Sequence, residues 1–117
     1  MIAGMDRLIQ IKAMASESRL AILRLLAQPD AHFSHQWSAD PAAYGVCMTL
    51  IAQALDVAQP TASRHLDILK QAGFIQVRKH LKWSYCKRDD AAIGEYLRWL
   101  AAEILPDRAH LPPFSQE

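Results

Sequence analysis

The sequence predicts a mainly α-helical fold with a small antiparallel β-ribbon, and three observations support this prediction. Apolar residues recur at helical spacing over most of the chain. A stretch of alternating apolar and polar residues follows Gly73, as in two short strands joined by a turn. The 117 residues, 51% hydrophobic and 21% charged, suit one globular domain. We expect this domain over residues 1–106, followed by a flexible tail over residues 107–117.

Several classes of protein do not fit the composition. No apolar run reaches the ~18–20 residues that a membrane span needs, so no membrane partner is expected. The first residues lack the layout of a signal peptide. Two cysteines do not make a disulfide framework, which agrees with a reducing compartment. These features favour a cytoplasmic location.

Two helices are expected at the start of the chain. The first covers residues 5–14. Ser16 or Ser18 can cap the second, which runs to Gln28 and ends before Pro29. Apolar residues surround most of this second helix, so we expect it to be buried: Leu20, Ile22, Leu23, Leu25 and Leu26.

A long connection over residues 29–44 follows. It is rich in Pro, Asp, Ser and His, and long ordered loops often carry function. Residues 45–48 form a short apolar run, expected as an edge strand that leads into a helix capped by Thr49. The aromatic residues of the connection are expected to pack in the core, with a small-molecule pocket as the alternative: Phe33, Trp37 and Tyr44.

Residues 49–73 predict two short helices joined by a tight turn, and this is the most informative part of the chain. The second helix opens at Gln59 and Pro60 and closes at Gly73. Its apolar stripe predicts burial of one face: Ala62, Leu66 and Leu69. The opposite face carries small hydrogen-bonding groups and cations. A helix with these two faces suits the major groove of DNA.

The β-ribbon follows directly. Ile75 and Val77 alternate in its first half, and Trp83 and Tyr85 do so in its second. The tip, residues 78–82, is basic. A basic ribbon after a recognition helix is typical of a wing, which reaches the minor groove or a row of phosphates.

Positive charge is concentrated in the same region. The whole chain has a net charge of only +1, but residues 59–89 hold seven Lys and Arg against two Asp. The balance of residues 90–117 is −3 and that of residues 1–58 is −1. Because attraction to phosphate is local, this asymmetry favours double-stranded promoter DNA as a partner.

Eight residues are predicted to contact DNA. Arg64 can make two hydrogen bonds to one guanine, which is worth ~1–3 kcal/mol of discrimination. His65 either touches a phosphate or covers the edge of the core. The predicted contacts are Gln59, Thr61, Ser63, Arg64 and His65 from the helix and Lys79, His80 and Lys82 from the wing.

A last helix begins near Asp89 or Asp90 and stops at Pro106. Its apolar stripe is long for a domain of this size: Ile93, Tyr96, Leu97, Leu100 and Ile104. We expect the excess to pack, together with the first helix, against a second copy of the chain.

This order of elements resembles the winged-helix repressors of the ArsR/SmtB family over roughly residues 8–105. The residues that carry the resemblance are Ser18-Arg19-Leu20, residues 55–73 and Trp83-Ser84-Tyr85. It implies a winged helix-turn-helix with about five helices and a two- to three-stranded antiparallel sheet. It also implies a homodimeric repressor that leaves an inverted-repeat operator when an unidentified signal arrives.

The chain departs from the family pattern at three places. Ala58 stands where the family often has a Ser cap, at a cost of ~1 kcal/mol. Leu81 stands where the wing tip usually has Gly, so this turn is expected to differ or to be strained. The arsenic-sensing members use a Cys-x-Cys and a further Cys, of which only Cys47 is present, since Thr49 and Ala52 occupy the other positions. Such an arsenic site is therefore not expected.

Cys47 and Cys86 are candidates for a redox signal. The strand before the helix-turn-helix should pair with the last wing strand, and these strands contain the two thiols. A disulfide there could tilt the wing and release DNA. The alternative is two buried thiols that act as small hydrophobic side chains.

No metal site, cofactor or catalytic centre is expected. The possible metal ligands form no complete set in the sequence: His32, His35, Cys47, Cys86, Asp107 and His110. No nucleophile elbow, phosphate loop or zinc-protease motif is present, so we expect no enzyme. The remaining alternative to a DNA-binding regulator is a winged-helix module that binds proteins and does not touch DNA.

Overall fold

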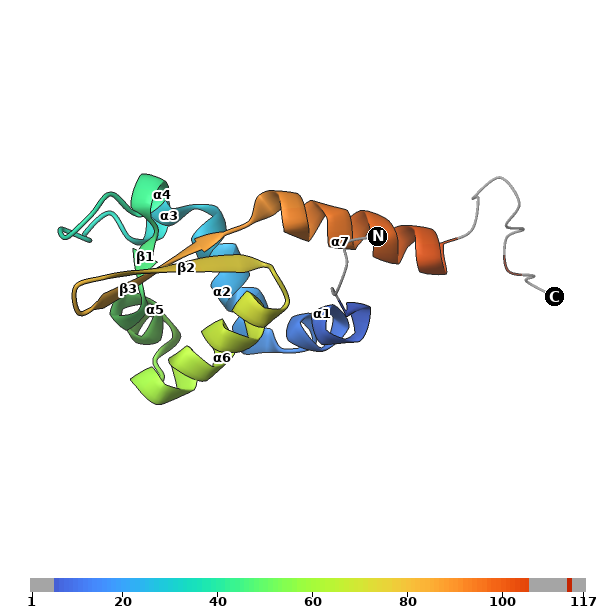
Figure 1. Ribbon diagram of the computed structural model, residues 1–117, viewed down its shortest axis with the longest axis horizontal. Helices are drawn as coiled ribbons and strands as arrows, with labels where there is room; N and C mark the ends of the chain where they lie inside the picture. Colours follow the sequence, from blue (N-terminus) through green and yellow to red (C-terminus); the bar gives the residue numbers. More distant parts are fainter. Residues whose placement is uncertain (1–5, 106–113, 115–117) are drawn as a thin grey trace.

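The computed structural model describes residues 6–105 and residue 114, which form a winged helix-turn-helix (Figure 1). The described residues contain seven helices and one three-stranded antiparallel sheet. The elements in chain order are α1 (Arg7–Met14), α2 (Glu17–Ala27), α3 (Pro29–His32), α4 (Pro41–Tyr44), β1 (Val46–Cys47), α5 (Met48–Leu55), α6 (Gln59–Gln71), β2 (Ile75–His80), β3 (Trp83–Arg88) and α7 (Asp90–Ile104).

The predicted fold class is confirmed, with one addition. The five longer helices lie where the sequence predicts them. The connection over residues 29–44 contains two further single-turn helices, α3 and α4, each of which opens with a proline. The tail predicted over residues 107–117 lies outside the described residues except for Phe114.

Side-chain caps explain where three of the longer helices begin. Asp6 accepts a hydrogen bond from the Leu8 N–H, Ser16 from the Arg19 N–H and Asp89 from the Ala92 N–H. The predicted cap at Thr49 is wrong, because α5 begins at Met48 and its N-cap position is Cys47, which makes no side-chain cap hydrogen bond. The Thr49 hydroxyl instead accepts a hydrogen bond from Gln59.

The sheet has the strand order β1-β3-β2, so β1 is an edge strand as predicted. Val77 pairs with Cys86, and Arg78 pairs with Tyr85. Because paired residues share a face, Tyr85 lies on the face opposite to Val77. From the alternation in the sequence, Ile75 and Val77 were expected on the same face of the ribbon as Trp83 and Tyr85. The observed register places the two pairs on opposite faces.

The long connection explains this register, since it covers the second face of the sheet. Figure 1 shows α3 and α4 on one side of the strands and α5 and α6 on the other. The ring centroids of Tyr44 and Tyr85 lie 4.9 Å apart, edge to face. Gly45 lets the chain pass close by, since its φ is 109° and a Cβ there would lie 3.0 Å from the Cys86 carbonyl oxygen. Both faces of the wing base are therefore apolar.

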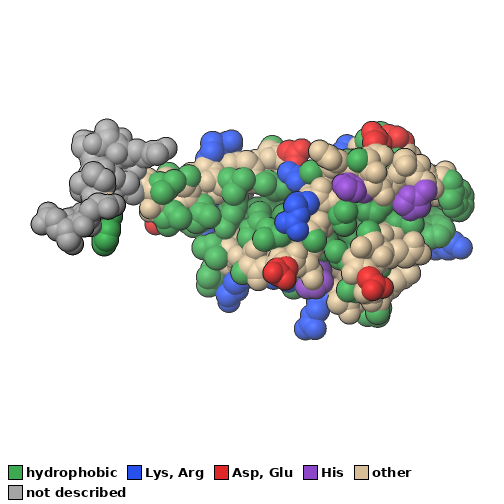
Figure 2. Space-filling model, turned by 180° about the vertical axis from the view of Figure 1, so that it is seen from behind, with side chains coloured by type: hydrophobic (Ala, Val, Ile, Leu, Met, Phe, Trp, Pro, Cys, Tyr) green, Lys and Arg blue, Asp and Glu red, His purple; other side chains and the backbone are tan. Residues whose placement is uncertain are grey.

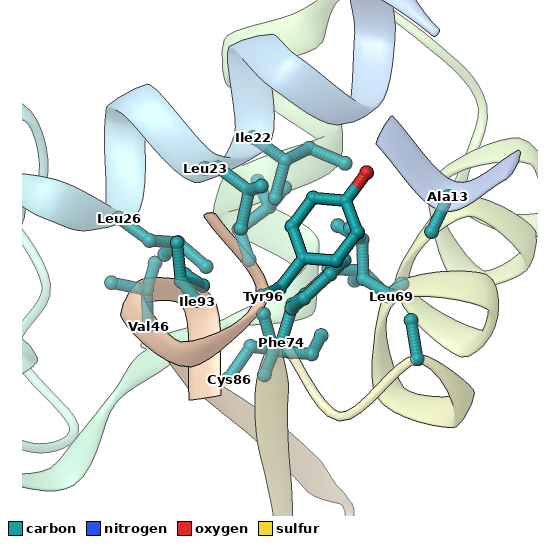
Figure 3. Packing of buried hydrophobic residues seen from close by; sticks show 14 of the residues in the cluster. Ala13, Ile22, Leu23, Leu26, Val46, Leu69, Phe74, Cys86, Ile93 and Tyr96 are labelled. Atoms are coloured by element: carbon teal, nitrogen blue, oxygen red, sulfur yellow. The ribbon is translucent and has the colours of Figure 1, made fainter. Parts of the chain in front are cut away.

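The core lies between α2, α6, α7 and the first face of the sheet (Figure 3). Ile22 from α2, Leu69 from α6 and Phe74 before β2 are fully buried. The rings of Phe74 and Tyr96 meet at a centroid distance of 5.2 Å, which joins α7 to this core. Burial of each such side chain stabilises the fold by ~1.5–3 kcal/mol. Leu20, predicted to be buried, is instead 38% exposed.

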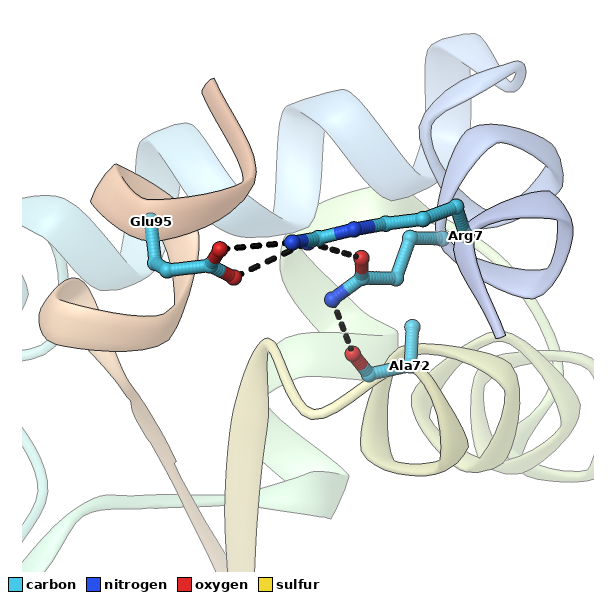
Figure 4. A network of polar contacts seen from close by, with 4 residues as sticks. Arg7, Ala72 and Glu95 are labelled. Atoms are coloured by element: carbon cyan, nitrogen blue, oxygen red, sulfur yellow. Dashed lines mark hydrogen bonds and ion pairs between the residues drawn. The ribbon is translucent and has the colours of Figure 1, made fainter. Parts of the chain in front are cut away.

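A polar network ties α1 to α7 and to the end of α6 (Figure 4). Arg7 Nη2 lies 2.6 Å from Glu95 Oε2, and Arg7 also donates to Gln10. The buried Gln10 amide donates to the Ala72 carbonyl at 3.1 Å. The hydrogen bond from Arg7 lowers the pKa of Glu95 and raises that of Arg7. The network fixes the position of the first and last helices relative to α6.

None of the helices in residues 6–105 combines the length and the apolar character that crossing a bilayer requires.

Candidate nucleic-acid interface

The helix-turn-helix consists of α5, a turn at Asp56 and α6. Asp56 adopts a left-handed conformation with φ 56°, which ends α5. The Gln59 amide donates to the Thr49 hydroxyl at 3.2 Å, so a side-chain contact joins the starts of both helices. At the other end, Gly73 has φ 83° and the Phe74 N–H bonds to the Leu69 carbonyl. These contacts set the ends and the angle of α6.

One face of α6 is buried and the other is open to solvent. The predicted stripe is buried as expected: Ala62, Leu66 and Leu69. Ala58 stands at the N-cap without a side-chain hydrogen bond, as predicted, so the first N–H groups of α6 have no side-chain partner at that position. Four of the five predicted DNA contacts on this helix are exposed: Gln59, Thr61, Ser63 and Arg64.

The fifth, His65, differs from these four. Its ring is half-buried, and Nδ1 lies 3.1 Å from Arg19 Nη1. Because a guanidinium can only donate, Nδ1 must accept, and the imidazole is neutral with its proton on Nε2. Burial, and then the charges of Arg19 and Arg64, lower the pKa of His65. The structure thus engages this ring with α2, the arrangement expected for a residue at the edge of the core.

A shallow groove separates α6 from the wing and carries positive charge from both. Its volume is about 280 Å³. Ser63 and Lys70 line it from α6, and Lys79 and Ser84 line it from the strands. Asp67 is an acidic residue in the same lining. Lys79, one of the predicted contacts, therefore lies on the side of the wing that faces the recognition helix.

The opposite side of the wing presents a second group of cations. The Arg78 guanidinium lies 4.3 Å from the centroid of the Tyr44 ring, and the His80 ring meets the same tyrosine edge to face. Lys82 Nζ lies 5.1 Å from the Trp83 ring centroid. Arg78 is not among the eight residues predicted to contact DNA, although strict alternation from Val77 places it on the same face of the strand as His80 and on the opposite face from Lys79.

The tip of the wing is a tight turn in which Leu81 has φ 56°. This is the strain expected from a leucine where the family usually has glycine, since a Cβ in the left-handed region costs ~1–2 kcal/mol. The side chain is 85% exposed, so no packing offsets this cost.

The two thiols lie in neighbouring strands but not together. β1 pairs with β3 as predicted, and the register sets Val46 opposite Cys86 and Cys47 opposite Tyr85. Cys47 and Cys86 therefore point to opposite faces of the sheet. Both are buried, and burial raises the pKa of Cys86 to about 12. This geometry argues against a disulfide between them, because β1 would have to shift by one residue first.

The histidines of the connection make no metal centre with other ligands. Among the described residues, no group of three or more His, Cys, Asp or Glu side chains converges. His32 and His35 are exposed, and the centroid of each ring lies 6.4 Å from that of the buried Phe33 ring. Asp107 and His110, the other two candidates, lie outside the described residues.

Comparison with known sequences identifies the chain as a transcriptional regulator. A family model described as a helix-turn-helix domain matches residues 14–78. The HTH-type transcriptional regulator YbzH of Bacillus subtilis is 41% identical over 100 residues, which cover 86% of this chain and 100% of that protein. The arsenical resistance operon repressor of Escherichia coli is 33% identical over 72 residues, which cover 62% of this chain and 50% of that protein.

Solved structures agree on the fold. The ArsR family transcriptional regulator RHA00566 is 20% identical, with a TM-score of 0.64 over 84% of this chain and 92% of that one. The homodimeric winged helix-turn-helix DNA-binding domain Mb0332 of Mycobacterium bovis is 25% identical, with a TM-score of 0.59 over 93% and 89%. These relatives are regulators and not enzymes. The chain belongs to the helix-turn-helix transcriptional regulators, of the ArsR/SmtB winged-helix type.

Proposed function

We propose that the protein is a homodimeric repressor that binds an inverted-repeat operator in double-stranded promoter DNA and leaves it in response to a signal. The exposed polar face of α6 beside a cationic wing is the observation that carries this proposal. A repressor of chromosomal promoters acts in the cytoplasm, which is part of the same proposal. The E. coli relative is itself described as a repressor, and the M. bovis domain as homodimeric.

The proposed dimer uses α1 and α7. Figure 1 shows α7 extending past the rest of the domain with α1 beneath it, and Figure 2 shows hydrophobic side chains gathered over this end. Leu97 is 52% exposed and Ile104 is 64% exposed on α7, and Leu8 is 54% exposed on α1. Exposed apolar side chains grouped in this way mark an interaction surface, and a second copy of the same helices would cover them.

The proposed DNA contacts divide into two roles. Gln59, Thr61, Ser63 and Arg64 would enter the major groove, where Arg64 reads a guanine. Lys79, His80 and Lys82 would contact phosphates, and His65 would stabilise α6 from behind through Arg19. Two copies of α6 related by a two-fold axis would reach half-sites about one helical turn apart or a multiple of it.

Binding to the DNA upstream of the protein's own gene tests this proposal. The affinity should exceed that for a scrambled duplex by about 10³-fold or more. It should also fall steeply with salt, with a slope near −0.9 for each phosphate contact. A protein-interaction module without DNA binding is the competing function. Weak binding that is equal on both duplexes would favour that competitor.

The thiol signal has a separate test. Since Cys47 and Cys86 are buried and face opposite sides of the sheet, mild peroxide should leave both thiols titratable after unfolding and DNA affinity unchanged. The matched variant is Cys86→Ser, which should behave like the parent protein towards peroxide. The opposite result would be an intramolecular disulfide, detected by mass spectrometry after alkylation, together with loss of DNA binding. That result would support thiol oxidation as the signal.

A further inference from the structure

A cleft of about 220 Å³ lies between the connection, the start of α5 and the wing. Its lining includes two indole rings, Trp37 and Trp83, together with the apolar side chain of Leu50 and the Cys47 thiol. The polar groups of the lining include the Thr49 hydroxyl and the His35 ring. None of the described residues that line the cleft is a Lys, Arg, Asp or Glu. A lining that carries two indole rings and lacks these charged residues favours an uncharged aromatic ligand.

The wall formed by the connection is already fixed in place. The buried Gln36 side chain donates to the carbonyls of Ala39 and Gly45 and accepts a hydrogen bond from the Cys47 N–H at 2.8 Å. All of its polar atoms are therefore used to pin the connection to β1. The neighbouring Trp37 is 86% exposed on this rigid support. An indole held in solvent beside an apolar cleft would gain free energy from a ligand that covers it.

The opposite walls belong to the wing and to α5, the helix that precedes the recognition helix. Trp83 is the strand partner of His80 and flanks the wing turn, and Lys82 lies over its ring. The Thr49 hydroxyl accepts the hydrogen bond from Gln59, the first residue of α6. A molecule in the cleft would thus touch the residues that support both the wing tip and the start of the recognition helix.

We propose that this cleft binds a small uncharged aromatic molecule of one or two rings, and that its binding changes the affinity for DNA. The cleft volume of about 220 Å³ is smaller than the ~300–1,000 Å³ of pockets for drug-sized ligands. The cleft therefore has room for a ligand of only one or two rings. The regulatory half of this inference rests on the proposed function. By thermodynamic linkage, if the ligand changes the protein's affinity for DNA by some factor, bound DNA changes the protein's affinity for the ligand by the same factor.

The site can be tested on the free protein by NMR, with 1-naphthol as the probe. The chain has three tryptophans, and their indole N–H signals report separately. We expect the signals of Trp37 and Trp83 to move in a saturable manner. Trp99, which packs under Arg7 on α7, should stay in place. The anionic analogue naphthalene-1-sulfonate should bind at least about tenfold more weakly, because its sulfonate would lose hydration in a cleft whose lining contains no Lys or Arg.

Two variants make the test specific. Trp37→Ala removes an exposed side chain, so it should fold and should weaken 1-naphthol binding at least about tenfold. The matched control is Leu81→Ala, which truncates an equally exposed side chain at the wing tip and should not alter binding. Equal movement of all three indole signals, no movement, or unchanged affinity in Trp37→Ala overturns the site.

The regulatory half is tested by repeating the titration with bound promoter DNA. We expect the affinity for 1-naphthol to change at least about fivefold. An unchanged affinity on bound DNA overturns regulation and leaves the site itself standing. A protein that binds no DNA overturns the proposed function and the regulatory half together, while the result on the free protein still decides the site.

Discussion

The two ends of this molecule differ in surface chemistry. At one end, α6 and the wing expose small polar groups and cations, within a segment whose net charge is +5 over residues 59–89. At the other end, α1 and α7 expose large apolar side chains such as Leu97 and Ile104, within a segment of net charge −3 over residues 90–117. In the proposed function, this separation would let one chain bind DNA and a second copy of itself without competition between the two contacts.

The Arg7–Gln10–Ala72 network connects the two ends. It joins α1 and α7 to the last residue before the turn that leaves α6. Because these contacts hold α6 against the proposed dimer helices, they would set the distance between the two recognition helices of a dimer. That distance decides which spacing of half-sites the dimer can bind.

The largest effect is expected from a charge placed on the apolar end. Leu97→Glu should raise the dimer dissociation constant about 100-fold, since it puts a carboxylate at the centre of the proposed interface. Analytical ultracentrifugation measures this constant. The control is Ala31→Glu, which introduces the same charge at an exposed site on α3 and should leave the dimer dissociation constant unchanged. A dimer of normal strength in Leu97→Glu would place the interface elsewhere.

Substitutions at the polar end should separate reading of bases from attraction to phosphates. Arg64→Ala should weaken binding to the operator by ~1–3 kcal/mol and binding to scrambled DNA much less. Lys79→Ala should weaken both to the same degree and reduce the salt slope by about 1. If Arg64→Ala loses the same amount of binding free energy on the operator and on scrambled DNA, Arg64 does not read a base. Arg24→Ala, on the exposed side of α2, is the control for loss of a cation.

The wing tip offers a smaller, local change. Leu81→Gly should raise the free energy of unfolding by ~0.5–1 kcal/mol, because glycine adopts φ 56° without a Cβ clash. Part of the gain is offset by the greater freedom of glycine in the unfolded chain. Urea denaturation measures the difference. A loss of stability would mean that the exposed leucine side chain packs on the wing in solution.

The smallest expected effect is a dependence of stability on pH at His65. Its pKa is lower in the folded than in the unfolded protein, so the unfolded state binds more protons as the pH falls below about 6.5. The free energy of unfolding should therefore decrease from pH 7 towards pH 5. His65→Gln should reduce this slope, because an amide can accept from Arg19 but does not titrate in this range. An unchanged slope would exclude His65 as its source.

Local patterns in the sequence predicted α6 and the wing well. The spacing of Ala62, Leu66 and Leu69 determines which face of α6 is buried, and Gly73 ends the helix because it can adopt a positive φ. These features depend on neighbours within one or two turns. The same is true of the strained turn at Leu81.

The features that were not predicted depend on contacts between distant residues. The register of the sheet follows from the connection that covers its second face, and this packing separates Cys47 from Cys86. The Thr49 hydroxyl accepts a hydrogen bond from Gln59 and is not a helix cap. A position at the edge of the core was one of the two roles predicted for His65, but its partner there, Arg19, is 46 positions away. At Trp37 the sequence favoured core packing over a pocket, but the side chain is exposed and lines a cleft that forms where the connection meets the wing.

The most direct test of the two-ended account is the composition of the complex with DNA from the protein's own promoter. Native mass spectrometry and footprinting of the same sample give the number of chains and the protected bases. We expect two chains per site and two protected half-sites about one helical turn apart or a multiple of it. One chain per site, or protection no stronger than on a scrambled duplex, would contradict it.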